Sequence, residues 1–321
     1  MVKVVIAGAT SQLAREVLQG LMRSGKHELL GLCREITEEV AVWSGSVLSL
    51  SATTYEDKQE LVRLLKSADV LLCFFSPMHD AEGKNQIRLI DAAVEAGVKR
   101  YVPSEWFAGA GLATAIADFP YMASKLAVRK YLEDLNRDKK VIEYTLLSPG
   151  MFMDYLAYPR STDATHTRSF ETFINMQEAR GFYMEGHEHD SFTLTAITDI
   201  VNVVLRAIDY EGEWPVNGGV AGETVTIRQL IELGEKLRGK SFAIEVLDPK
   251  DVEAGDLKVT KLDRITHPSI PPEQLEYFTK AALAATLRAI ATGGMVVDGE
   301  WNRLLPDYKF MTVEELLRKH F

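Results

Sequence analysis

The chain has 321 residues, of which 46% are hydrophobic and 26% charged, so it is long enough for one large domain or two unequal ones. Its formal net charge of −10 disfavours nucleic-acid binding through a broad basic surface. We find no secretory signal and no apolar run of the roughly 18 residues needed to cross a bilayer, which predicts a cytoplasmic protein without a membrane partner.

The first half alternates apolar runs with amphipathic segments. Apolar runs predict strands at 2–8, 27–34, 69–75, 99–102 and 142–148. Helical spacing predicts helices between Leu13 and Gly25, at about 56–67, at 83–96, at about 120–136 and at 196–209. Strands that are apolar throughout and separated by helices indicate a parallel sheet covered on both faces, which is a doubly wound, Rossmann-type α/β fold.

The alternation ends after Gly150, which predicts a Rossmann domain over 1–150 and a smaller α/β substrate domain over 151–321. Segments near 190–220 are candidates to return to the Rossmann sheet. Thr226 with Gln229, and Thr312 with Glu315, have the spacing of capping boxes at helix starts. Cys33 and Cys73 lie inside apolar strands, so both are expected to be core residues.

The segment GATSQLA (8–14) directly follows the first strand, where a dinucleotide fold binds pyrophosphate at a helix N-terminus. Of the expected G-x-x-G-x-x-G only Gly8 is present, because Ser11 and Ala14 occupy the other two positions. Ser11 adds a side chain where the backbone approaches phosphate and disfavours a positive φ, although its hydroxyl can donate to phosphate. The predicted cofactor contacts in this loop are Gly8, Thr10, Ser11, Gln12 and Leu13, and an empty loop is the alternative.

Arg34 ends the second strand, where the adenosine ribose of a bound dinucleotide would lie. An arginine there pairs with the 2′-phosphate of NADP(H), whereas an acidic residue would favour NAD(H). A solvated arginine at a strand end is the other interpretation.

GATSQLA resembles the phosphate loop of the NmrA-like and isoflavone-reductase-like branch of the atypical short-chain dehydrogenases. The similarity continues in NQIRLIDAAVEAGVKRYVPSEWFAG (85–109), EYTLLSPGMFMDY (143–155) and LLPDYKFMTVEELLRKHF (304–321). It implies an NADP(H)-binding domain, a substrate domain and a site in the cleft between them. The family includes reductases of phenolic and other secondary metabolites and redox-sensing regulators.

Tyr121 and Lys125 form Y-x-x-x-K on the predicted helix at 120–136, and residues four apart share a helix face. A cation beside the phenol would favour its phenolate, and the lysine can hold the nicotinamide ribose. The resemblance supports Lys125 more strongly than Tyr121, because the isoflavone-reductase branch commonly relies on the lysine alone.

The resemblance also implies cofactor contacts from two further strand ends. These are Phe75, Ser76 and Pro77 beside the ribose, and Gly150, Met151 and Phe152 beside the nicotinamide. Candidate substrate contacts are Ser104, Trp106, Phe152 and Tyr155, each with a purely structural alternative such as turn capping or core packing. His187 and His189 lack a third ligand at usable spacing, so no metal is expected.

We therefore predict an NADPH-dependent reductase of a small aromatic or polyketide-like molecule, with Lys125, with or without Tyr121, as the proton donor. Two alternatives remain: a regulator that senses NADP(H), and a non-redox isomerase, cyclase or dehydratase suggested by the altered loop. The sequence gives no indication of the oligomeric state.

Overall fold

The structure is a computed structural model that describes residues 1–43, 45, 47–80, 82–265 and 270–321. The chain forms two compact units. The first comprises Met1–Trp106, Tyr121–Leu147 and Val201–Gly218, and the second comprises Phe107–Pro120, Ser148–Ile200 and Gly219–Phe321. The sequence predicts one boundary after residue 150, whereas each of these compact units takes three segments of the chain. The predicted division into a cofactor domain and a substrate domain stays a prediction.

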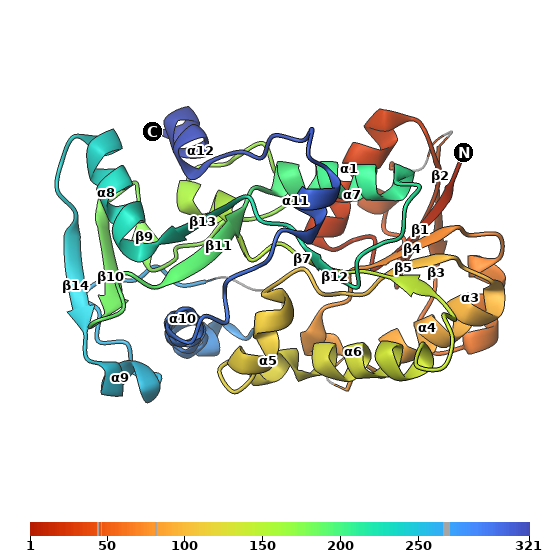
Figure 1. The fold of residues 1–321 in the computed structure, drawn as a ribbon, viewed down its shortest axis with the longest axis horizontal. Helices are drawn as coiled ribbons and strands as arrows, with labels where there is room; N and C mark the ends of the chain where they lie inside the picture. Colours follow the sequence, from red (N-terminus) through yellow and green to blue (C-terminus); the bar gives the residue numbers. More distant parts are fainter. Residues whose placement is uncertain (44, 46, 81, 266–269) are drawn as a thin grey trace. The chain divides into compact units, whose positions relative to one another are not determined.

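The first unit is built on a six-stranded sheet in the order β3-β2-β1-β4-β5-β6 (Figure 1). Its strands are β1 (Lys3–Ala7), β2 (Glu28–Cys33), β3 (Leu48–Ala52), β4 (Val70–Cys73), β5 (Arg100–Val102) and β6 (Glu143–Tyr144). All neighbouring strands pair in parallel. This order, reversing at β1 and β4, is that of the Rossmann fold and confirms the predicted fold class.

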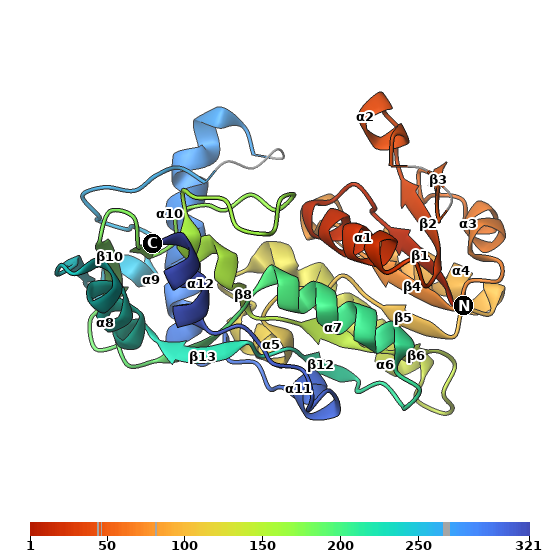
Figure 2. The same cartoon turned by 90° about the horizontal axis from the view of Figure 1, so that it is seen from above.

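Helices cover both faces of this sheet, with α1 and the later part of α7 on one face and α3, α4 and α6 on the other (Figures 1 and 2). The helical elements are α1 (Gln12–Ser24), α2 (Glu38–Ala41), α3 (Lys58–Leu65), η1 (Pro77–His79), α4 (Lys84–Ala96), η3 (Pro120–Met122), α6 (Ala123–Leu135) and α7 (Ile197–Asp209). Gly20 allows α1 to approach α7 closely, because a Cβ there would lie 2.5 Å from Val201 Cγ1.

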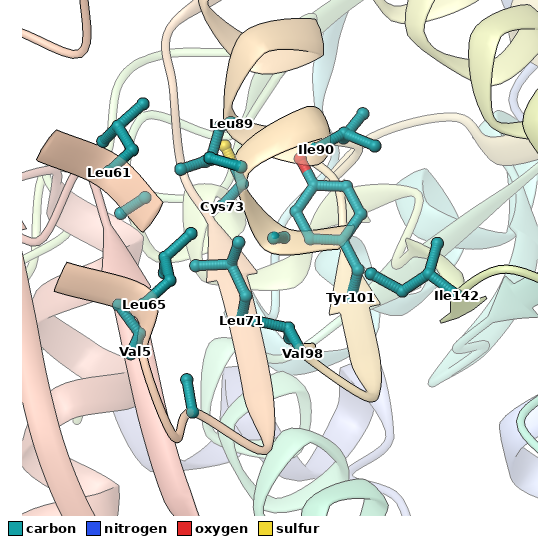
Figure 3. Close-up of a cluster of buried hydrophobic side chains, with 14 of the residues drawn as sticks. Val5, Leu61, Leu65, Leu71, Cys73, Leu89, Ile90, Val98, Tyr101 and Ile142 are labelled. Carbon is teal, nitrogen blue, oxygen red and sulfur yellow. The ribbon is translucent and has the colours of Figure 1, made fainter. Parts of the chain in front are cut away.

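One buried cluster of the first unit lies between the sheet and helices α3, α4 and α6 (Figure 3). Strand residues Val5, Leu71 and Tyr101 pack against helix residues such as Leu61 and Leu89, and all five are fully buried. Burial of such side chains from both layers is the main stabilising contribution to this unit. Cys33 and Cys73 are free thiols in the buried strands, as predicted.

Two elements of the first unit differ from the sequence interpretation. No strand is predicted between residues 34 and 56, but this stretch contains the edge strand β3. The strand predicted over 142–148 is divided into β6 and β7 (Leu146–Ser148), and the Leu146 N–H donates to the Val216 carbonyl at 2.8 Å. β6, with only two residues, therefore ends the six-stranded sheet, and the chain then leaves this sheet to form β7, which pairs with a different strand.

The second unit combines two three-stranded sheets with helices. The sheets have the orders β14-β10-β9 and β13-β11-β8. The elements are η2 (Gly109–Gly111), α5 (Leu112–Ala115), β8 (Met151–Phe152), η4 (Met153–Ala157), β9 (Ile174–Asn175), β10 (Arg180–Met184), β11 (Ser191–Thr195), β13 (Glu223–Thr226), α8 (Ile227–Arg238), β14 (Ala243–Leu247), α9 (Pro249–Glu253), η5 (Pro272–Gln274), α10 (Leu275–Ala291), α11 (Glu300–Leu304) and α12 (Val313–His320). The short strand β12 (Asn217–Gly219) lies at the boundary, with its first two residues in the first unit.

Both predicted capping boxes are present in the second unit. Thr226 and Gln229 open α8, and Thr312 and Glu315 open α12, each with reciprocal side-chain and backbone hydrogen bonds. Across the described part of the chain, no helix is both long enough and apolar enough to span a membrane.

Candidate functional site

The loop after β1 has the geometry of a phosphate-binding turn. Gly8 has a φ of +76°, and a Cβ at this position would lie 3.0 Å from the Phe74 carbonyl oxygen, so only glycine fits without strain. Helix α1 begins at Gln12, and its first turn has no acidic residue. The first N–H groups of a helix lack intrahelical acceptors and carry the positive end of the helix dipole, so this turn favours an anion.

Ser11 does not strain the loop as the sequence suggested. Its φ is −68° and its ψ 155°, which is ordinary extended backbone, and its side chain caps α1 by accepting a hydrogen bond from the Ala14 N–H at 3.4 Å. The position therefore has no need of glycine's conformational freedom. The Ser11 hydroxyl keeps its own hydrogen for donation, so the departure from the glycine pattern is no argument against a bound phosphate.

Arg34 lies next to this loop because of the strand register. Ala7 on β1 pairs with Leu32 on β2, and the Gly8 and Ala9 N–H groups both donate to the Leu32 carbonyl, at 3.1 and 3.0 Å. Arg34 follows two residues later, just beyond the end of β2, and is exposed. The strand register thus places the backbone of an exposed arginine near the phosphate turn.

Phe75, Ser76 and Pro77 follow β4, the strand on the other side of β1. Ser76 is the N-cap residue and Pro77 the first residue of η1. The Phe75 carbonyl accepts a hydrogen bond from the Ser104 hydroxyl at 2.7 Å. Ser104 is buried and ties the end of β4 to the end of β5, which gives its side chain a structural role.

Lys125 lies on α6 and is only 5% exposed. Its ammonium donates to the Ser104 carbonyl at 2.6 Å and to the Glu105 carbonyl at 2.7 Å. Desolvation lowers the pKa of Lys125 to about 8, against a smaller raising effect of Glu105. Two of its three N–H donors are thereby directed at the end of β5, and the group can exchange a proton near neutral pH.

Glu105 and Arg129 form a buried ion pair that the sequence analysis missed. The Arg129 guanidinium donates to both carboxylate oxygens of Glu105, at 2.8 and 2.6 Å. Arg129 follows Lys125 by one helical turn, while Glu105 supplies a carbonyl to Lys125. The pair fixes the backbone that holds the lysine. The four-residue spacing from Lys125 on a predicted helix was the available sequence signal.

Tyr121 is placed differently from the prediction. It lies in the 3-10 turn η3 rather than on the α-helix, which begins at Ala123. Burial raises the pKa of its hydroxyl to about 12, whereas a neighbouring ammonium would lower it. Tyr121 thus lies in the turn that leads directly into α6, and its catalytic role stays a prediction.

Trp106 is anchored by the end of β4. Its indole stacks on Phe74 with centroids 4.4 Å apart and ring planes 7° apart, and its N–H donates to the Cys73 carbonyl at 2.8 Å. Its φ of +40° is unusual for a non-glycine residue and is held by these contacts. Cys73 itself is fully buried and is therefore a core residue, and this burial raises the pKa of its thiol to about 12.

The remaining predicted contacts belong to the second unit. Gly150 has a φ of +69°, and a Cβ there would lie 2.4 Å from the Thr193 carbonyl oxygen. Met151 and Phe152 form β8. The ring of Tyr155 packs against those of Phe152 and Phe170, with centroid distances of 5.5 and 4.2 Å. Their roles beside a nicotinamide or a substrate stay predictions.

The segment containing His187 and His189 is a turn between β10 and β11. His187 Nδ1 lies 2.6 Å from an Asp190 carboxylate oxygen. Within the ranges that the structure describes, no group of three or more histidine, cysteine, aspartate and glutamate side chains is arranged to hold a metal ion.

The sheet order, the glycine turn and the helix that follows it define a Rossmann-type α/β protein. The chain belongs to the NmrA-like family, whose sequence model matches residues 2–271. The resemblance found in the sequence is thereby confirmed.

The chain is also similar to several known proteins. Oxidoreductase swnN of Metarhizium robertsii is 23% identical over 340 residues, covering 99% of this chain and 97% of that protein. A bifunctional pinoresinol-lariciresinol reductase of Linum usitatissimum is 26% identical over 263 residues, covering 78% and 79%. The solved structure of AtPrR2 with NADP+ and (+)pinoresinol has a TM-score of 0.74 at 19% identity, covering 100% and 99% of the two chains.

Proposed function

We propose that the protein is an NADPH-dependent reductase of a small secondary metabolite with an aromatic or polyketide-like skeleton. The observation that carries the proposal is the placement of Arg34 beside the Gly8 turn by the register of β1 and β2. A backbone anion site with an adjacent exposed guanidinium suits a dinucleotide that bears an additional 2′-phosphate. The relatives named as an oxidoreductase and a reductase, and the similar structure that holds NADP+, support this proposal.

The residues of the first unit fit the cofactor. Thr10, Gln12 and Leu13 would contact the pyrophosphate through backbone N–H groups, and Ser11 through its hydroxyl. Gly8, whose own N–H donates to the Leu32 carbonyl and the Tyr55 hydroxyl, would let the phosphate approach the turn closely. Arg34 would pair with the 2′-phosphate, and Phe75, Ser76 and Pro77 would flank the ribose. When bound, NADPH supplies a hydride from its nicotinamide ring.

Lys125 would act as the proton donor. Its lowered pKa keeps a useful fraction of both protonation states near neutral pH, which is the condition for efficient general acid catalysis. The Ser104 and Glu105 carbonyls orient the ammonium, so its third N–H can donate to a substrate oxygen that gains negative charge as hydride arrives. Ser104, Trp106, Phe152 and Tyr155 remain the proposed substrate contacts.

Titration of the protein with NADPH and with NADH, followed by nicotinamide fluorescence, tests the cofactor. We expect NADPH to bind more tightly than NADH. Arg34→Ala should raise the dissociation constant for NADPH about tenfold and leave that for NADH nearly unchanged. Arg23→Ala is the matched control, because Arg23 is an exposed arginine in the last turn of α1. If Arg34→Ala binds NADPH as tightly as the wild-type protein does, the proposed role of Arg34 is contradicted.

Turnover separates the reductase from the alternatives. Substrate-dependent oxidation of NADPH in a screen of phenolic carbonyls, enones and benzylic ethers is the expected result. Tight NADPH binding with no turnover would indicate a regulator that senses the cofactor. Conversion of a substrate without any change in the oxidation state of the nucleotide would indicate a non-redox enzyme.

A further inference from the structure

Tyr55 is held in an unusual backbone conformation beside the candidate phosphate loop. It follows β3 with a φ of +64°, a region that non-glycine residues adopt rarely and at a cost of roughly 1–3 kcal/mol. Two contacts stabilise it there. The Tyr55 N–H donates to the Thr53 hydroxyl at 3.1 Å, and the Arg88 guanidinium donates to the Tyr55 carbonyl at 2.9 Å.

This backbone conformation directs the phenol beneath the Gly8 turn. The Tyr55 hydroxyl donates to the Leu32 carbonyl at 2.7 Å and accepts from the Gly8 N–H at 3.0 Å. The side chain is 5% exposed, and burial raises the pKa of the phenol, which keeps it neutral and able to donate. Loss of the hydroxyl would remove one hydrogen-bond partner from the Gly8 N–H and one from the Leu32 carbonyl.

The ring of Tyr55 reaches a third segment. It meets the ring of Phe75 edge to face, with centroids 4.6 Å apart and an interplanar angle of 71°. One side chain thus contacts the glycine turn, the strand end that leads to Arg34, and the segment after β4. These three segments supply the proposed contacts to pyrophosphate, 2′-phosphate and ribose.

We propose that Tyr55 is a positioning residue for the dinucleotide site, acting through the Gly8 backbone and the Phe75 ring. The inference rests on the proposed function. Hydrophobic packing alone does not explain the residue type, because phenylalanine would fill the same space without two buried hydrogen bonds. A strained backbone that is held by contacts from Thr53, just after β3, and from Arg88 on α4, and that positions one buried hydroxyl, is typical of a functional site.

Tyr55→Phe tests the inference because it removes only the hydroxyl. We expect the dissociation constant for NADPH to rise about three- to tenfold, the effect of one lost buried hydrogen bond. The KM for NADPH should rise in parallel while kcat at saturating NADPH changes little. Tyr131→Phe is the matched control, since its hydroxyl donates to Asp91 on α4 and contacts none of the three segments.

Hydrogen exchange in the nucleotide-free protein gives a second readout. In Tyr55→Phe we expect faster exchange in a peptide over residues 4–11, and we expect Tyr131→Phe to leave that peptide unchanged. Arg88→Gln, which removes the support of the Tyr55 carbonyl, should weaken NADPH binding in the same direction. This second variant also covers the case in which Tyr55→Phe folds poorly.

The outcomes separate the two proposals. Wild-type NADPH affinity and wild-type exchange in Tyr55→Phe would overturn the role of Tyr55 and leave the reductase proposal intact. If the wild-type protein binds neither nucleotide, the proposed function fails. In that case hydrogen exchange over residues 4–11 still decides whether the Tyr55 hydroxyl stabilises the loop. Exchange at the wild-type rate in Tyr55→Phe would then overturn the role of Tyr55 as well.

Discussion

At the scale of single residues, Lys125 is the group whose environment determines most of the proposed chemistry. It is buried, its ammonium is shared between two carbonyls, and a buried ion pair fixes one of the residues that supply them. The lysine was apparent from the sequence through the Y-x-x-x-K pattern. Its partners were not, because the contact between Glu105 and Arg129 joins residues 24 positions apart and depends on how α6 packs against the end of β5.

The pH dependence of turnover tests Lys125. Desolvation lowers its pKa to about 8, so the group is an ammonium below that pH and a neutral amine above it. A proton donor works in its protonated form, so we expect kcat/KM to be level below about pH 8 and to fall about tenfold per pH unit above it. Stopped-flow measurement of NADPH oxidation between pH 6 and 10 gives the profile.

Two variants accompany this measurement. Lys125→Ala should lose at least about 100-fold in kcat and keep NADPH binding within a few fold, since general acid catalysis is typically worth that much. Lys130→Ala is the control on the same helix, because Lys130 is exposed and pairs with Asp134. A wild-type profile that stays flat from pH 7 to 10 would show that another group donates the proton.

At the scale of elements, the N-terminus of α1 joins stability to binding. Ser11 and Thr226 are both N-cap residues, and their hydroxyls accept from backbone N–H groups at 3.4 and 3.1 Å. Substitution of either by alanine should cost about 1 kcal/mol of stability. Only Ser11→Ala should also weaken NADPH binding, because only α1 faces the proposed pyrophosphate.

Chemical denaturation and nucleotide titration of the two variants decide this. The stability changes show that each cap is lost, and the titration shows which cap serves the ligand. An equal effect on NADPH affinity from Ser11→Ala and Thr226→Ala would mean that the Ser11 effect is a general loss of stability. Unchanged affinity in both would remove the Ser11 hydroxyl from the proposed phosphate contacts.

The elements that the sequence predicted well are those with a strong apolar signal. β1, β4 and the helices with one apolar face have such patterns, so their existence and order followed from periodicity. β3 was missed because it has no continuous apolar run like those of the buried strands. Its sequence, LSLSA, alternates apolar residues with serines over only five positions, which is the weaker signal of a short, half-exposed edge strand. The position of Tyr55 could not be predicted either, because it depends on where β3 ends and on a hydrogen bond from Arg88, which lies more than thirty residues later in the chain.

At the scale of the whole molecule, the proposed cofactor contacts fall in both compact units. Gly8, Arg34, Phe75 and Lys125 belong to the first unit, whereas Gly150, Met151 and Phe152 belong to the second. The fold class followed from the sequence because the strand–helix alternation is local. The division of the chain into units does not follow from any local pattern, since the second unit takes segments from three parts of the chain.

Hydrogen exchange with and without NADPH tests whether the cofactor contacts both units. A ligand that binds the folded state slows exchange in the segments that it stabilises, by an amount that grows with its concentration above the dissociation constant. If NADPH contacts both units, peptides over 4–13 and 73–78 and a peptide over 149–155 should all gain protection. The exposed start of β14 in the second unit is the internal reference, because no proposed contact lies there.

Protection limited to the first unit would change the proposed mechanism. The adenosine half of NADPH would then be bound as expected, while Gly150, Met151 and Phe152 would have only structural roles. Gly150 already has one, because the Thr193 carbonyl leaves no room for a Cβ. Protection of 149–155 by NADPH, and its persistence in Lys125→Ala, would instead show that the second unit helps to hold the nicotinamide independently of the proton donor.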